Sequence, residues 1–145
     1  MKFFKFAKDG GPQSRVSGLF IIEIKKLFSI VLLRFDDGAR DAFHTHAFNA
    51  WSWVLKGHLI EMVQHRVQLN GEGYPAFWTA RNDYLPSWRC IKTPRECMHK
   101  VISEGVTWAI TFRGPWSDTW HEYLPQENVG LTLTHGREVV EREVL

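Results

Sequence analysis

The sequence predicts an all-β fold, either a sandwich or a barrel, and two observations support this expectation. Short stretches rich in β-branched and aromatic residues recur at intervals of roughly 8–12 residues, with turn signals between them. Few stretches have the pattern of a helix. At 145 residues the chain corresponds to one domain, and its 44% apolar content excludes a disordered protein.

The chain is expected to open with an arm over residues 1–18, followed by a single β domain over residues 19–145. The arm is basic at first and becomes loop-like at the Asp-Gly-Gly-Pro stretch of residues 9–12. Residues 20–24 form the first predicted strand of the domain. Residues 27–35 form the second, which is apolar on both faces and should therefore be buried.

The rest of the domain alternates between predicted strands and turns. The remaining strands have alternating or continuous apolar residues, at 41–46, 48–55, 58–64, 84–91, 97–103 and 106–113. Clusters containing Gly, Asp or Asn mark turns or loops at 36–38, 56–57, 70–73 and 104–105. Two segments stay open: 117–123 as a short helix or a turn, and 137–145 as a helix, a strand or a frayed tail.

Composition and charge exclude several classes of protein. The net charge is only +2 and Lys and Arg are scattered, whereas a nucleic-acid-binding protein usually shows a basic stripe. The longest apolar run, Leu27–Leu33, is far short of the roughly 20 residues that span a bilayer. Residues 1–8 lack the apolar core and cleavage site of a secretory signal. We therefore expect a cytoplasmic protein with no nucleic-acid or membrane partner.

The two cysteines, Cys90 and Cys97, are too few for a disulfide framework, and their spacing is not that of a CxxC metal knuckle. We expect them to be small buried apolar residues. The unusual feature of the composition is its seven Trp and seven His.

Three of the histidines have the spacing of a metal site. His44 and His46 are two residues apart on a predicted strand, so their side chains point to the same face. A third ligand must come from another strand, and His99, at a predicted loop-to-strand transition, is the candidate. Three neutral imidazoles suit Zn, Fe, Ni or Cu and leave positions open for water or substrate. The alternative is a pair of polar surface histidines.

At these residues the sequence resembles the cupin superfamily, whose fold is a double-stranded β-helix or jelly-roll barrel. The first cupin motif is Gly-x5-His-x-His-x3,4-Glu-x6-Gly, and Gly38, His44, His46 and Gly57 match it in register. The second is Gly-x5-Pro-x-Gly-x2-His-x3-Asn, which Pro94 and His99 match, with Glu96 in place of Gly and Ser103 in place of Asn. Residues 107–116 also resemble the end of small uncharacterised cupins carried by phages.

The resemblance implies His44, His46 and His99 as ligands of a divalent transition metal, which is Fe, Zn, Ni or Mn. The Glu of the first motif is replaced by Ala50. The site is then a three-histidine centre, as in cupins that resemble thiol dioxygenases, or a centre completed by another acid, or a cupin that has lost its metal. Glu61 and Glu96 are expected to orient ligands or to exchange protons rather than to bind the metal.

Arg113, at the end of a predicted strand, is expected either to bind a substrate carboxylate or phosphate or to form a surface ion pair. The large aromatic residues divide into two groups. Trp51, Trp53, Trp108 and Phe112 have period-two spacing and should pack in the barrel core or a dimer interface, although some could line a substrate cavity. Trp116 and Trp120 follow Arg113 in a loop-like segment and suggest a cap or an interface.

Three functions fit this sequence. The first is a small-molecule metalloenzyme, a non-haem iron dioxygenase with a three-histidine site. The second is a metal-free isomerase or epimerase of sugar nucleotides, because residues 20–30 followed by His44 and His46 are similar in layout to the small cupin keto-isomerases, whose histidines act as acid–base groups. The third is a cupin that binds a metal or ligand without catalysis. A homodimer and a small-molecule substrate are the expected partners.

Overall fold

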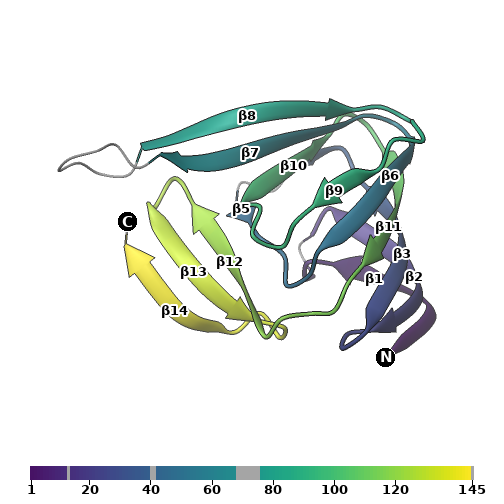
Figure 1. The fold of residues 1–145 in the computed structure, drawn as a ribbon, viewed down its shortest axis with the longest axis horizontal. Helices are drawn as coiled ribbons and strands as arrows, with labels where there is room; N and C mark the ends of the chain where they lie inside the picture. Colours follow the sequence, from purple (N-terminus) through teal and green to yellow (C-terminus); the bar gives the residue numbers. More distant parts are fainter. Residues whose placement is uncertain (13, 40–41, 68–75, 145) are drawn as a thin grey trace.

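The computed structural model describes residues 1–12, 14–39, 42–67 and 76–144, and it confirms the all-β prediction (Figure 1). The chain forms two antiparallel sheets that face each other around a cavity. The loop expected at 70–73 lies outside the described residues. Among the residues that are described, no helix is long and apolar enough to cross a membrane.

The first sheet has six strands. Its order is β1 (Lys2–Asp9), β2 (Val16–Ile24), β3 (Phe28–Phe35), β11 (Thr107–Arg113), β6 (Ala50–Lys56) and β9 (Ile91–Thr93). Strand β11 thus lies between β3 and β6, although some 50 or more residues separate it from β6 in sequence. The predicted strands at 20–24, 27–35, 48–55 and 106–113 all lie in this sheet.

The second sheet has eight strands and carries the remaining elements. Its order is β14 (Val139–Val144), β13 (Val129–Thr134), β12 (Thr119–Leu124), β5 (Phe43–His44), β10 (His99–Ser103), β7 (Leu59–Val67) and β8 (Ala76–Tyr84), and β4 (Gly38–Ala39) also pairs with β10. The β7–β8 hairpin extends along the top of Figure 1, and β12 to β14 form its lower left.

Several elements differ from their predictions. Residues 2–9 and 16–18, expected as parts of an arm outside the β domain, belong to the first sheet, because β1 pairs with β2 along its length. Residues 85–90 are not a strand: β8 ends at Tyr84, and Pro86, which has no N–H for a ladder, lies in the following loop. Residues 119–124 form a strand where a helix or turn was expected, and the open question at the C-terminal end resolves as strand β14.

The alternation of β6 and β11 decides which side chains face the cavity. Small residues on both strands line it, namely Ala50, Ser52, Val54, Ala109 and Thr111. The bulky residues Trp51, Trp53, Trp108 and Phe112 therefore lie on the outer face of the six-stranded sheet, because successive side chains of a strand point to opposite sides. Of the two predicted locations, the barrel core is therefore wrong, since a cavity between the sheets needs small side chains on its wall, and the dimer interface stays a prediction.

The turn after β6 explains one of the matched glycines. Gly57 has a φ of 101°, which side chains disfavour. A Cβ at this position would also lie 2.5 Å from Thr107 Oγ1 and 2.7 Å from the Val106 carbonyl oxygen. The turn therefore requires glycine for both its backbone conformation and its close contact with the start of β11.

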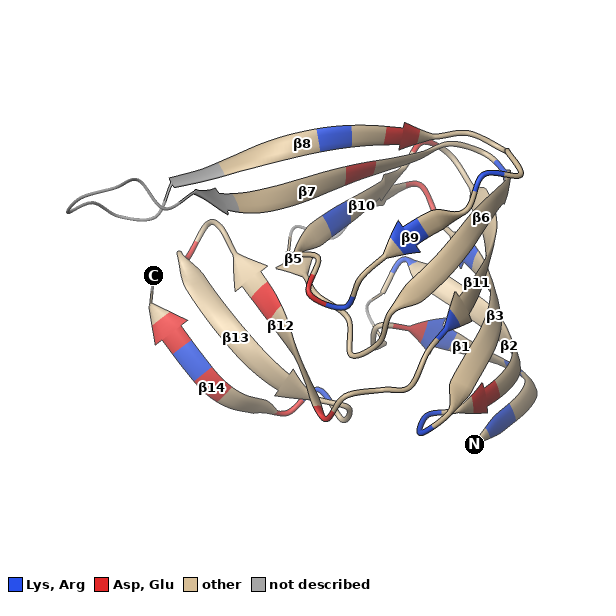
Figure 2. Ribbon diagram, viewed as in Figure 1, with Lys and Arg blue, Asp and Glu red and all other residues tan. Residues whose placement is uncertain are grey.

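Charged residues of both signs are spread over the two sheets, as Figure 2 shows. On the cavity wall, charged side chains pair with neighbours: Glu23 with Lys2, and Arg113 with Asp9.

Candidate metal centre

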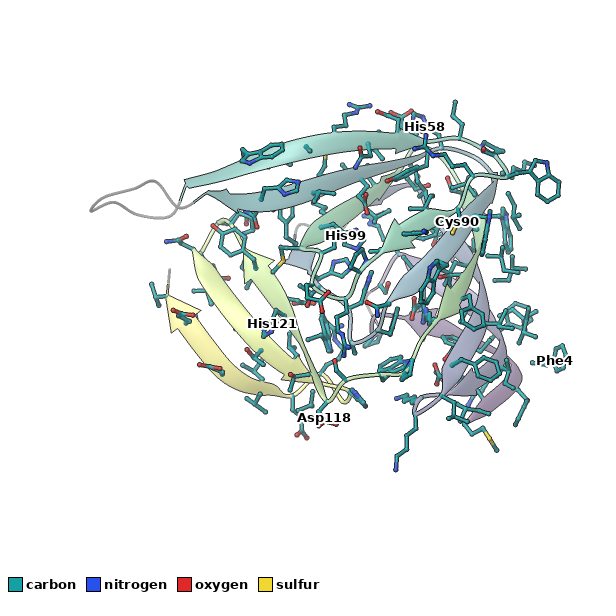
Figure 3. All side chains as sticks on the ribbon, viewed as in Figure 1. Phe4, His58, Cys90, His99, Asp118 and His121 are labelled. Atoms are coloured by element: carbon teal, nitrogen blue, oxygen red, sulfur yellow. The ribbon has the colours of Figure 1, made fainter. Side chains whose placement is uncertain are left out.

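Strands β5 and β10 bring the three predicted histidines together. His44 ends β5 and lies directly opposite His99, the first residue of β10. Residues opposite each other in an antiparallel pair point to the same side of the sheet. His46 follows two residues after His44, and the three ring centroids lie 4.9 to 5.1 Å apart. In Figure 3, His99 lies between the two sheets, whereas Phe4 of β1 points away from them.

The spacing of the nitrogens fits a metal ion. Each histidine offers one nitrogen, and these three atoms lie within 4.8 Å of one another. Two nitrogens bound to one tetrahedral ion at about 2.1 Å are about 3.4 Å apart, and His46 Nε2 and His99 Nε2 are 3.4 Å apart. The cluster is therefore a candidate metal site whose donor set suits a transition metal.

Burial favours the protonation state that binds metal. Burial lowers the pKa of His46 well below its ordinary value, and the neighbouring His99, His44 and Arg113 lower this pKa further. The His46 ring is therefore neutral near pH 7. A neutral imidazole is the form that coordinates a metal, because a protonated one has no free lone pair.

Glu61 of β7 fixes the orientation of His99. The Nδ1–H of His99 donates a hydrogen bond of 2.6 Å to Glu61 Oε2, and both side chains are buried. Burial raises the pKa of Glu61, but the hydrogen bonds from His99, Tyr84 and Asn82 outweigh it, and the pKa is lower than usual. The ionised carboxylate only accepts hydrogen bonds, so the proton of His99 is on Nδ1. The lone pair on Nε2 then points toward His46.

Two residues of β8 hold Glu61 in place. Tyr84 donates its hydroxyl to Glu61 Oε1 at 3.0 Å, and the side-chain amide of Asn82 donates to the same oxygen at 3.4 Å. Glu61 thus accepts from both sides, and a ligand histidine held by a carboxylate is a common support of metal sites.

Cys97 forms part of a second cluster that shares His99. Ligand atoms of Glu61, Cys97 and His99 lie within 4.8 Å of one another. Burial, and secondly the charge of Glu61, raise the pKa of the Cys97 thiol to about 11. Thiolates are the sulfur form that binds metal, so this cluster is less suited to an ion than the three histidines. Cys90 and Cys97 are both free, as expected, but each is only partly buried and not fully buried as predicted.

The three other predicted site residues lie in different surroundings. Glu61 is beside the histidines. Arg113 lines the same cavity, where its buried guanidinium pairs with Asp9. Glu96 is 76% exposed, pairs with Arg95 at 3.4 Å and does not line the cavity. The structure therefore brings Glu61 and Arg113 to the centre and leaves Glu96 at the surface.

The cavity around the histidines has a volume of about 450 Å³, which is enough for a small molecule. Aromatic rings close one side of it. The ring of Phe48 lies parallel to that of His46 at 5.2 Å, and Trp116 and Trp120 pack against the cluster of Ala47, Phe48 and Ala50. Trp116 and Trp120 thus form a wall of the cavity, in agreement with the expected cap.

Sequence reasoning missed three residues of this environment. The sequence predicts Tyr84 at the start of a strand, but Tyr84 ends β8; it predicts Asp9 in a loop of the arm, but Asp9 ends β1. His135, for which the sequence predicts no role in the site, lines the cavity and contacts the Trp116 ring edge-on at 4.9 Å. These three residues lie outside the histidine motifs in sequence, so no local pattern indicates that they lie near the histidines in the fold.

Comparisons with known proteins support the fold. No family model matches the sequence, and no curated protein matches it significantly. A solved structure described as a sugar phosphate isomerase of the cupin superfamily, from Silicibacter pomeroyi DSS-3, aligns with a TM-score of 0.57 at 12% identity, over 92% of this chain and 85% of that chain. A cupin-2 domain protein from Rhodospirillum rubrum aligns with a TM-score of 0.54 at 13% identity, over 82% and 71%.

Proposed function

The chain has the cupin fold, and from this premise we propose that it is a metal-dependent enzyme that acts on a small molecule. The observation that carries this proposal is the convergence of three imidazoles on a cavity of about 450 Å³, with Glu61 holding one of them in its ligand tautomer. Within this class we propose a non-haem iron dioxygenase with a three-histidine site formed by His44, His46 and His99.

Each part of the cavity has a role in this proposal. Bound Fe(II) supplies redox chemistry with O2 and open coordination positions for a substrate. Glu61 keeps the proton of His99 on Nδ1 and so keeps Nε2 available. Phe48 and Trp116, whose rings lie 5.1 Å apart, exclude water from the side of His46. Arg113 offers positive charge to an anionic group of the substrate.

Metal analysis of untagged protein tests this proposal. We expect about one iron per chain, and we expect it to be lost in His99→Ala. The matched control is His121→Ala, which removes an exposed histidine of β12 whose Nδ1 contacts Thr132 Oγ1, outside the cluster. Folded protein without metal, or His121→Ala losing as much metal as His99→Ala, would overturn the proposed site. A redox-inactive metal such as Zn would retain the site and overturn the dioxygenase.

A second candidate function is supported by the His99–Glu61 pair. A histidine with a carboxylate on Nδ1 is also suited to general acid–base catalysis, because the carboxylate stabilises the imidazolium that forms. The Silicibacter pomeroyi protein, which aligns over most of this chain, is described as a sugar phosphate isomerase. A metal-free isomerase of sugar nucleotides would show a raised melting temperature with nucleotide sugars after treatment with a chelator. The dioxygenase proposal predicts no such shift.

We also propose a homodimer formed through the outer face of the six-stranded sheet. Phe112 on this face is 39% exposed and stacks on Phe28, and Phe6 of the edge strand β1 is 74% exposed. Monomeric proteins seldom expose a contiguous patch of large apolar side chains. Light scattering should give twice the chain mass, and Phe112→Glu should give a monomer, whereas Val139→Glu on exposed β14 should not. A monomeric wild-type protein would exclude the dimer.

A further inference from the structure

Besides the histidines, the cavity wall contains a buried guanidinium. Arg113 is the last residue of β11, and its side chain is only 4% exposed. Its guanidinium lies over the ring of Phe48 at 4.7 Å and 5.9 Å from the ring centre of Phe20. Aromatic faces attract a cation but do not hydrogen-bond all its donors. A buried guanidinium therefore needs an anion beside it.

Asp9 supplies that anion in this structure. Arg113 Nη1 donates to Asp9 Oδ1 at 3.2 Å and Nη2 donates to Asp9 Oδ2 at 2.5 Å, which is a bidentate contact with a planar carboxylate. The Nε of Arg113 is buried, and it has no hydrogen-bond partner among the described residues. The guanidinium thus provides a place shaped for a carboxylate and keeps one donor unused.

The position of Asp9 in the fold allows its carboxylate to be displaced from Arg113. It is the last residue of β1, an edge strand that pairs only with β2, and Gly10 and Gly11 follow it with φ values of 91° and 99°. Its side chain is 26% exposed, compared with 4% for Arg113. Moving the Asp9 carboxylate into water hydrates it, whereas Arg113 stays buried and therefore needs another anion to take the place of Asp9.

The same place lies next to the histidine cluster. The ring of Phe48 contacts both the His46 ring and the Arg113 guanidinium. Arg113 is also directly opposite Ala50 on the paired strand β6, so both side chains point into the cavity and the small methyl group leaves space beside the guanidinium. A ligand anchored on Arg113 would extend toward His46.

We propose that Arg113 anchors a carboxylate group of the cavity's ligand, and that Asp9 occupies this position until the ligand displaces it. Exchange of one carboxylate for another keeps the guanidinium paired throughout. This proposal narrows the substrate of the function proposed above to carboxylates, but the Arg113 position itself requires no metal. Asp9 of the N-terminal strand then acts as an internal competitor of the ligand.

Titration of chelator-treated protein with propionate, followed by NMR, tests this inference. In the wild type we expect saturable shifts of the Arg113 Nε–H and of the Gly10 amide, because the guanidinium exchanges one carboxylate for another and Gly10 follows the release of Asp9. In Asp9→Asn, which removes the competing charge, we expect propionate to bind about tenfold or more tightly. Arg113→Gln should abolish binding. Equal affinity in the wild type and Asp9→Asn, or unchanged binding in Arg113→Gln, would overturn the proposal.

Two further measurements test whether the variants fold and which class of anion binds. Asp9→Asn leaves a buried cation without its partner, so propionate should raise its melting temperature more than that of the wild type; no such rise would overturn the proposal. Asp83→Asn removes an exposed carboxylate that pairs with Arg81 away from the cavity, and its response to propionate should match the wild type. Inorganic phosphate should bind more weakly than propionate, and the reverse order would overturn the assignment to carboxylates. None of these experiments contains metal, so a negative result would overturn the Arg113 proposal without testing the proposed metal site.

Discussion

The Nδ1–H of His99 donates to Glu61 Oε2 across 2.6 Å, between two buried side chains on neighbouring strands. Glu61 lies opposite Val101 in this pair, so His99, two residues away on β10, is its diagonal neighbour on the same face. The contact joins a predicted metal ligand to an acid that does not occupy a ligand position of the cupin motif. It makes Glu61 a positioning residue for the candidate centre, and the first prediction follows from it.

Glu61→Gln should weaken metal binding about 10- to 100-fold, as loss of a carboxylate partner of a ligand histidine usually does. Gln can still accept one hydrogen bond but does not carry the charge that holds the proton on Nδ1. Glu96→Gln is the matched control, because Glu96 is exposed and pairs only with Arg95 in the described contacts. Competition with a chromogenic chelator measures both affinities. Equal affinities for the two variants would show that Glu61 does not support the site.

The stability of the metal-free protein should fall as the pH drops below about 6.5. Burial, and then His99, His44 and Arg113, lower the pKa of His46 in the folded state, whereas an unfolded histidine titrates near 6.5. The unfolded chain therefore binds more protons than the folded one in this range, and protonation favours unfolding. Urea unfolding between about pH 5 and 8 measures this slope. His46→Asn should flatten the slope, and an unchanged slope in this variant would contradict the shifted pKa.

Glu61 should also control the reactivity of Cys97. Burial and the Glu61 charge raise the pKa of this thiol to about 11, so it reacts slowly with iodoacetamide near neutral pH. In a Cys90→Ser background, Glu61→Gln should speed alkylation and shift its pH profile downward, because it removes the second of the two causes. A profile that stays the same after Glu61→Gln would mean that burial alone sets the pKa.

Two glycine substitutions separate backbone strain from steric clash. Gly57 and Gly105 both have positive φ, but a Cβ at Gly57 would meet Thr107 Oγ1 at 2.5 Å, whereas a Cβ at Gly105 meets nothing within 4 Å. Gly105→Ala should cost about 1–2 kcal/mol of stability from its backbone alone. Gly57→Ala should cost more, since it adds the clash. Urea unfolding of the two variants compares them, and an equal cost would show that the turn relaxes to admit the methyl group.

The fold, the histidine cluster and two further residues of the cavity, Glu61 and Arg113, could be predicted from the sequence, but the partners of those two residues could not. His44 and His46 share a face by strand periodicity, and the resemblance to cupins identified His99. By contrast, Asp9 meets Arg113 only because β1 pairs with β2 at the edge of the first sheet, and no local pattern encodes that pairing. Alternation correctly grouped Trp108 with Phe112, but it cannot tell which face of a sheet surrounds a cavity.

Glu61 and Glu96 also show that sequence spacing does not reveal which residues meet at the site. Both are acids near the histidines in sequence, and the sequence predicts the same supporting role for both. Glu61 is on β7, which lies next to β10 in the sheet, whereas Glu96 is in the turn before β10 and faces solvent. Their different positions follow from which strands are neighbours in the sheet, which is a property of the fold and not of the spacing.

The central claim is that His44, His46 and His99 hold one metal ion, and anomalous diffraction from metal-loaded crystals tests it most directly. We predict one anomalous peak within about 2.0–2.2 Å of a nitrogen of each histidine, with Glu61 Oε2 still accepting from His99 Nδ1. A peak between Glu61, Cys97 and His99, or no peak in a protein with the cavity intact, would contradict this account.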